Sequence, residues 1–155
     1  MTAFVLDRES LLVSSPGDAN VADLERFLER EGLTLDLSPV PDATVDDWLA
    51  HGATGARSPW LDPVDHLLAG FEVTLGDGRR LEVRPAPRRA VGPDMLALFF
   101  GTEHRFGAFS RAWLRVHPRG VVRPATAPFD AKEGPLEPGE HALWDALEKE
   151  LSSRS

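Results

Sequence analysis

The stretch that decides the fold reads GFEVTLGDGRRLEVRP and spans residues 70–85. Within it, two runs of alternating apolar and polar residues, 71–75 and 81–84, flank a Gly-Asp-Gly turn at 76–78. Alternation puts the apolar side chains on one face of an extended strand, and glycine accepts the positive φ that a tight turn needs. The stretch therefore predicts a β-hairpin.

Patterns on both sides of the hairpin predict further strands and helices. Strands are expected at residues 3–7, 11–15 and 107–117, and helices at 21–31, 46–51, 93–99 and 140–151. Because strands and helices are mixed without regular alternation, we expect an α+β fold, with an antiparallel or mixed sheet and flanking helices. The hairpin and the strand at 107–117 should share that sheet, and the helix at 21–31 should pack on one of its faces.

Two sets of apolar side chains are expected to join the core. From the last strand these are Trp113, Leu114 or Val116. From the C-terminal helix they are Leu143, Trp144 and Leu147, which recur at helical spacing. An amphipathic helix gains stability by burying such a face, so we expect the C-terminal helix to dock on the rest of the domain.

Composition limits the classes of function. The chain has 155 residues, 42% of them apolar, which is enough for one domain with a core. Its net charge of −8 disfavours nucleic-acid binding, and the absence of cysteine excludes disulfides and thiolate chemistry. With no basic, apolar leader and no run near the ~20 apolar residues that cross a bilayer, we expect a cytoplasmic chain without membrane partners.

Four stretches carry a resemblance to a known family, in the same order along the chain. They are residues 11–33, 43–58, 64–81 and 92–118, which read LLVSSPGDANVADLERFLEREGL, ATVDDWLAHGATGARS, VDHLLAGFEVTLGDGRRL and GPDMLALFFGTEHRFGAFSRAWLRVHP. The first stretch resembles a strand, a Pro-Gly turn and a helix of that family, and the second resembles its TxGG loop. The third resembles an Asp-x-Val element followed by a hairpin. The fourth resembles a Gly-Ser-Glu-Gly stretch before a strand that ends in His-Pro. This pattern is that of the FAD-linked oxidase family, also called PCMH-type or vanillyl-alcohol-oxidase-type.

The resemblance covers roughly residues 4–118 and implies a domain organisation. Residues 1–118 would form the second subdomain of a PCMH-type FAD-binding domain. Residues 119–155 would add a proline-rich wrap and a C-terminal amphipathic helix to the same domain. The family's glycine-rich pyrophosphate loop and large substrate domain have no counterpart in this sequence, so the resemblance implies a truncated oxidase-like protein.

The resemblance also implies a set of flavin-facing residues. They are Thr44, Val45, Gly52, Gly55, Arg57, Gly101, Gly107, Ala108 and Phe109. A second interpretation of the same residues needs no ligand. In it, the first five belong to an inherited tight loop, and the last four form a turn that leads into a core strand.

Four positions depart from the family pattern, which carries glycine at each of them. They are Asp46, Asp47, Asp62 and His104. Glycine lets the backbone approach a ligand, whereas aspartate adds a side chain and a negative charge. A carboxylate and a phosphate of FAD are both negative, and two like unit charges ~4 Å apart at an effective dielectric constant of ~20 repel each other by about 4 kcal/mol. FAD is therefore possible by resemblance, but its binding is expected to be weak or absent in this chain alone.

A metal site is not expected from the sequence. Asp62, Asp65 and His66 lie close together, but Pro63 suits the first position of a helix that Asp62 would cap. No HExxH or comparable ligand spacing occurs. No catalytic residue can be named either, because the chemistry of the family belongs to the flavin.

Two functions of different class stay open, and whether the chain is an enzyme stays open with them. In the first, the chain is an accessory or partner subunit with a degenerate flavin site and no activity alone, a pseudoenzyme. In the alternative, it is one component of a split flavoprotein that binds FAD with a complementary chain and oxidises a small alcohol or hydroxy acid. Both hypotheses imply a protein partner or a homo-oligomer.

Overall fold

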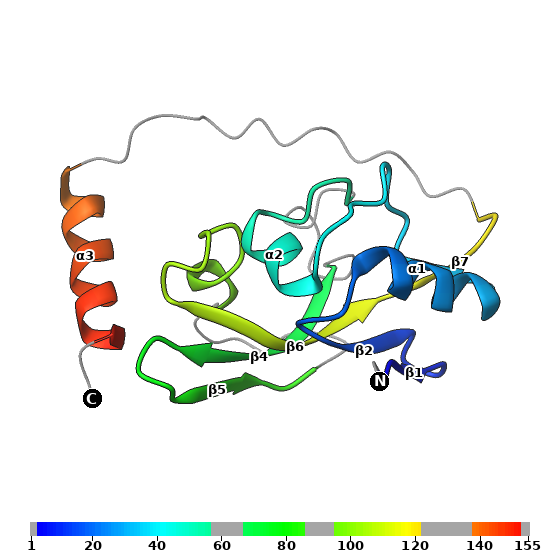
Figure 1. Cartoon of the computed structure of the whole chain (residues 1–155), viewed down its shortest axis with the longest axis horizontal. Helices are drawn as coiled ribbons and strands as arrows, with labels where there is room; N and C mark the ends of the chain where they lie inside the picture. The colour runs from blue at the N-terminus through cyan, green and yellow to red at the C-terminus, as the bar shows by residue number, and fades with distance from the viewer. Residues whose placement is uncertain (1–2, 57–66, 86–94, 122–137, 153–155) are drawn as a thin grey trace.

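A computed structural model describes residues 3–56, 67–85, 95–121 and 138–152 of the chain (Figure 1). Its centre is an antiparallel sheet with strand order β1-β2-β6-β4-β5. These strands are β1 (Val5–Asp7), β2 (Leu12–Pro16), β6 (Gly107–Arg115), β4 (Leu68–Leu75) and β5 (Arg80–Val83). The α+β fold with an antiparallel sheet and flanking helices is confirmed.

The predicted hairpin is formed by β4 and β5. Phe71 pairs with Val83 and Thr74 pairs with Arg80, which fixes the register of the two strands. The turn closes through a 2.9 Å hydrogen bond from the backbone amide of Gly78 to the carbonyl of Leu75. Strand β4 begins at Leu68, earlier than the alternation alone predicts. Its first four residues, 68–71, are all buried, so this part of the strand shows no alternation of apolar and polar residues.

Strand β6 is the central strand, with β2 on one side and β4 on the other. Its register against β4 shifts where Arg111 pairs with Glu72 and Phe109 pairs with Val73, which leaves Ser110 as the extra residue of a bulge. The single strand predicted at 107–117 is wrong in one respect. It ends at Arg115, and the chain then forms β7 (His117–Pro118), which pairs with β3 (Leu33–Thr34) in a separate two-stranded sheet.

Two helices cover one face of the main sheet (Figure 1). In α1 (Val21–Arg30), Asn20 is the N-cap and its side chain accepts a 2.8 Å hydrogen bond from the amide of Ala22. Helix α2 (Val45–Ala50) is shorter and is capped by Thr44. Both helices bury apolar side chains in the core that also holds Leu114 and Val116. The helix predicted at 93–99 is instead a 3₁₀ turn, η1 (Met95–Leu98), and residues 93–94 lie outside the described part.

The C-terminal helix α3 (Pro138–Ser152) stands beside the end of the sheet (Figure 1). Trp144 and Leu147 pack against the core as predicted, and the ring of Trp144 lies 5.2 Å from that of Phe106. The prediction for Leu143 is wrong, because its side chain points to solvent and is 59% exposed. Over the described residues, no helix combines the length and apolar character of a membrane span.

Candidate functional site

The start of α2 is attached to the turn between β2 and α1. The backbone amide of Asp46 donates a 2.8 Å hydrogen bond to the carbonyl of Gly17, and that of Val45 donates to Ala19 at the same distance. The hydroxyl of Thr44 accepts a hydrogen bond from the amide of Asp47, which completes the cap of the helix. These bonds place Asp46 and Asp47 in the first helical turn, with their carboxylates at the surface of the sheet.

Gly17 is the residue on which this junction depends. A Cβ atom built at Gly17 would lie 1.8 Å from the carbonyl oxygen of Phe109, well inside van der Waals contact. The amide of Gly17 also donates a 2.9 Å hydrogen bond to the carbonyl of Ser110, in the bulge of β6. Only glycine lets these backbone segments approach so closely.

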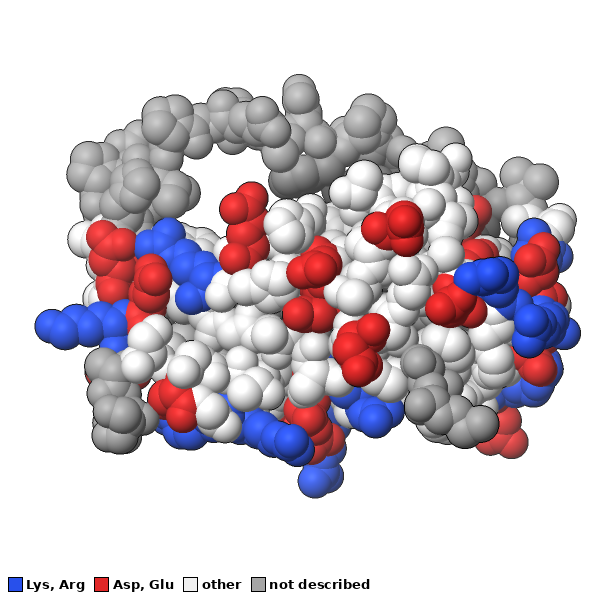
Figure 2. All heavy atoms as spheres, viewed as in Figure 1, with Lys and Arg blue, Asp and Glu red and all other residues white. Residues whose placement is uncertain are grey.

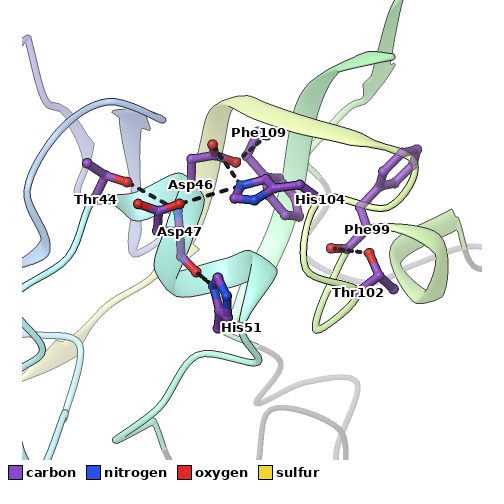
Figure 3. Close-up of polar contacts among 8 residues, drawn as sticks. All are labelled: Thr44, Asp46, Asp47, His51, Phe99, Thr102, His104 and Phe109. Carbon is purple, nitrogen blue, oxygen red and sulfur yellow. Dashed lines mark hydrogen bonds and ion pairs between the residues drawn. The ribbon is translucent and has the colours of Figure 1, made fainter. Parts of the chain in front are cut away.

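An open cleft of about 500 Å³ lies where these segments meet. Its lining residues are Gly17, Asp18, Thr44, Asp46, Asp47, Phe109 and Ser110. The charged side chains of this lining are all carboxylates. One of them is fixed in place, because Oδ1 of Asp46 accepts a 2.7 Å hydrogen bond from the backbone amide of Phe109 (Figure 3).

His104 faces the same two carboxylates from the loop that follows η1 (Figure 3). Its Nε2 atom lies 3.0 Å from Oδ2 of Asp46 and 3.7 Å from Oδ1 of Asp47. The loop is held against the end of α2, since the amide of Glu103 donates a 2.9 Å hydrogen bond to the carbonyl of Ala50. We call Asp46, Asp47 and His104 the carboxylate–histidine triad. The ligand atoms of the triad all lie within 4.8 Å of one another.

The backbone of His104 has a φ of 63°, in the left-handed region that favours glycine. This explains the glycine of the family pattern at that position, and a side chain there costs about 1 kcal/mol or more. The neighbouring His51 does not join the triad. Its Nδ1 atom lies 2.8 Å from the carbonyl oxygen of Asp47, and its ring meets that of His104 edge-on at 6.1 Å.

The structure brings some of the predicted flavin-facing residues to the cleft. Thr44 and Phe109 line it directly. Gly52 and Gly101 lie side by side at the end of α2, where a Cβ on Gly101 would be 3.8 Å from Cα of Gly52. Arg57 lies outside the described residues.

The other predicted site residues have structural explanations. Val45 is fully buried in the core, and Ala108 pairs with Thr74 across the sheet. A Cβ on Gly55 would lie 2.3 Å from the carbonyl oxygen of Pro39, and one on Gly107 would lie 2.6 Å from that of Thr74. Close backbone packing therefore explains both of these glycines without a ligand.

Sequence reasoning missed three residues of the cleft, namely Gly17, Asp18 and Ser110. The Pro-Gly pair at 16–17 was the available signal, but on its own it indicates only a turn. It also missed the contact of His104 with α2. The cluster of Asp62, Asp65 and His66, which the sequence analysis considered as a metal site, lies outside the described residues.

Comparisons with known proteins found similarity to a curated sequence relative and to solved structures of the same fold. No family model matches the chain. Its sequence is 28% identical over 100 residues to the uncharacterized FAD-linked oxidoreductase YgcU of Escherichia coli, in strains K12 and O157:H7, with 63% of this chain and 21% of that protein aligned. Two crystal forms of alkyldihydroxyacetonephosphate synthase match the fold with a TM-score of 0.60, at 21% identity over 76% of this chain.

The fold is that of PCMH-type FAD-binding proteins. The sequence is similar to a section of an FAD-linked oxidoreductase, and the chain spans about a fifth of the length of the relatives it matches. The resemblance drawn from the four sequence stretches is thereby confirmed.

Proposed function

We propose that this section of the FAD-linked oxidase fold works without bound flavin, as an accessory or partner-binding subunit. The observation that carries the proposal is the carboxylate–histidine triad. Its three members occupy positions at which the family pattern has glycine, and the chain folds so that their side chains meet at ion-pair distances. Space that glycine would leave open to a cofactor is filled by the chain's own side chains.

Electrostatics supports the proposal. Acidic side chains occupy the middle of the face that bears α2, and basic ones gather at its ends and lower edge (Figure 2). The carboxylate of Asp46 lines the cleft and is held there by its hydrogen bond from the amide of Phe109. A phosphate ~4 Å from such a carboxylate is repelled by up to about 4 kcal/mol, less the screening by water and ions.

The persistence of the remaining glycines does not require a flavin. Gly17, Gly55 and Gly107 each face a backbone carbonyl oxygen at a distance that excludes a side chain. Loss of a cofactor would leave these packing requirements unchanged. A flavin-free chain would therefore keep most of the glycines of the family pattern, as this chain does.

One observation favours the second candidate, a split flavoprotein. The curated relatives are named as FAD-linked oxidoreductases. If a complementary polypeptide supplies the rest of a flavin site, FAD could be held at the shared surface and oxidise a small alcohol or hydroxy acid. In that arrangement the contact between His104 and Asp46 would have to break before the cofactor enters.

Visible absorption of the purified chain, alone and after co-purification with any tightly bound protein, tests the proposal. We expect no flavin absorption in either sample. A yellow complex that loses its colour when the partner is removed would support the split flavoprotein instead. Flavin bound to the chain alone would contradict the proposed function.

A further inference from the structure

We propose that the carboxylate–histidine triad binds a divalent transition-metal ion, with Zn²⁺ as the reference ion. The inference rests on the proposed function, because the triad stays assembled only where flavin does not occupy the cleft. The sequence analysis expected no metal site. It had no means of relating His104 to Asp46 and Asp47, which the chain brings together only on folding.

The spacing of the ligand atoms fits a shared ion. A Zn²⁺ ion holds nitrogen and oxygen ligands at ~2.1 Å, so neighbouring ligand atoms lie about 3.0 Å apart in octahedral and about 3.4 Å apart in tetrahedral geometry. The distances from Nε2 of His104 are 3.0 Å to Asp46 and 3.7 Å to Asp47. All three ligand atoms lie within 4.8 Å of one another, so the side chains would draw closer together around one ion.

The ring nitrogen of His104 gives a second indication. Nε2 is enclosed by protein atoms, and its 3.0 Å ion-pair contact with Oδ2 of Asp46 lacks the geometry of a hydrogen bond, so no hydrogen bond satisfies this nitrogen within the described residues. Figure 3 shows it facing the space between the two carboxylates. A buried nitrogen without a hydrogen bond is unfavourable in a folded protein, and coordination of an ion would satisfy it.

The charge of the triad and the hydrogen bond to Asp46 agree with this assignment. Two carboxylates and a neutral imidazole carry two negative charges, which a divalent ion balances. The oxygen of Asp46 that does not face His104, Oδ1, accepts the hydrogen bond from the amide of Phe109. Carboxylates that bind metal ions commonly accept such a hydrogen bond on their other oxygen. Imidazole combined with carboxylates favours zinc and its transition-metal neighbours over Mg²⁺ and Ca²⁺.

The triad supplies three ligands and leaves room for more. Its carboxylates line the cleft of about 500 Å³, and the side chain of Asp47 is 58% exposed. Solvent can therefore supply the remaining ligands. Three protein ligands with open positions are typical of exchangeable and catalytic sites, whereas structural zinc sites are closed by four protein ligands.

Isothermal titration calorimetry of the full chain with ZnCl₂ tests the proposal. We expect one ion per chain, with affinity lowered at least about ten-fold by His104→Gln and by Asp47→Asn. Matched controls are His51→Gln, a neighbouring imidazole outside the triad, and Asp18→Asn, a carboxylate of the same cleft. Both controls should bind as the native chain does. MgCl₂ in place of ZnCl₂ should give weaker binding.

Several outcomes would overturn the proposal. One is the absence of stoichiometric Zn²⁺ binding. A second is an equal affinity for Zn²⁺ in the two triad variants and the native chain. A third is a loss of Zn²⁺ affinity in the two controls that equals the loss in the triad variants. Circular dichroism of each variant without metal separates loss of a ligand from loss of the fold, and Asp47→Asn, at an exposed side chain, provides the variant least prone to misfolding. A flavin titration run in parallel keeps the proposed function separate, because a chain that binds neither FAD nor Zn²⁺ would contradict only this inference.

Discussion

Nε2 of His104 lies 3.0 Å from Oδ2 of Asp46, so a loop residue after η1 contacts the first turn of α2. Each of the two residues stands where the family pattern has glycine. The same carboxylate also accepts the amide hydrogen of Phe109, in the central strand. Asp46 therefore joins a helix, a loop and a strand.

The first prediction concerns the carboxylate of Asp46. Asp46→Ala removes the acceptor for the partly buried amide of Phe109, which should cost about 1–3 kcal/mol in the free energy of unfolding. Asp47→Ala, at an exposed side chain, should cost less than about 1 kcal/mol. Urea unfolding of both variants measures the difference. Equal costs would show that the bond to Phe109 does not stabilise the fold.

The second prediction concerns Gly17. Gly17→Ala would place a Cβ atom 1.8 Å from the carbonyl oxygen of Phe109, and relief requires the backbone to move. We expect a loss of about 3 kcal/mol or more in stability. Gly76→Ala is the matched control, because the nearest atom to its Cβ is 3.6 Å away. Thermal melting midpoints that fall equally in the two variants would argue against the close approach.

The third prediction concerns the docking of α3. Trp144 packs on Phe106, and the guanidinium of Arg105 lies 5.4 Å from the Trp144 ring. Trp144→Ala should therefore cost about 2 kcal/mol. Leu143→Ala, at a side chain 59% exposed in the same helix, should change stability by less than about 0.5 kcal/mol. If denaturant unfolding gives the same small change for both, α3 is not docked in solution.

The fourth prediction concerns pH and the β4–β5 turn. The amide of Arg79 donates a hydrogen bond to the carboxylate of Asp77 and thereby lowers the pKa of that group. A lowered folded-state pKa adds stability above the unfolded pKa of ~3.9, and this stability is lost as pH falls through the folded value. At neutral pH the native chain should therefore have a higher melting temperature than the Asp77→Ala variant. The difference between the two melting temperatures should narrow below about pH 4. A gap of unchanged size at about pH 3 would contradict the assignment.

The sequence predicted those parts of the fold that local patterns determine. Alternation around the Gly-Asp-Gly turn was enough for the hairpin, and Asn20 with Gly32 was enough for the limits of α1. Local patterns do not determine where a strand leaves its sheet. Strand β6 ends at Arg115 because β3, formed elsewhere in the chain, pairs with the residues that follow.

The candidate site could be predicted only in part, for a related reason. The glycines of the family pattern predicted which segments would lie near one another, and the aspartates among them predicted a weaker affinity for phosphate. Nothing in the sequence indicated that His104 would contact Asp46, since this depends on the loop bonds to the end of α2 and on the left-handed backbone at His104. Nor did it distinguish Gly55 and Gly107, explained by packing, from glycines that approach a ligand.

The central claim is that the chain's own side chains have replaced flavin in the cleft. Flavin fluorescence titration of the native chain and of Asp46→Gly with Asp47→Gly tests it most directly. We expect no measurable FAD binding by the native chain, and a measurable affinity in the double variant that increases at low salt, where screening is weaker. Tight, one-to-one binding of FAD by the native chain alone would contradict the account.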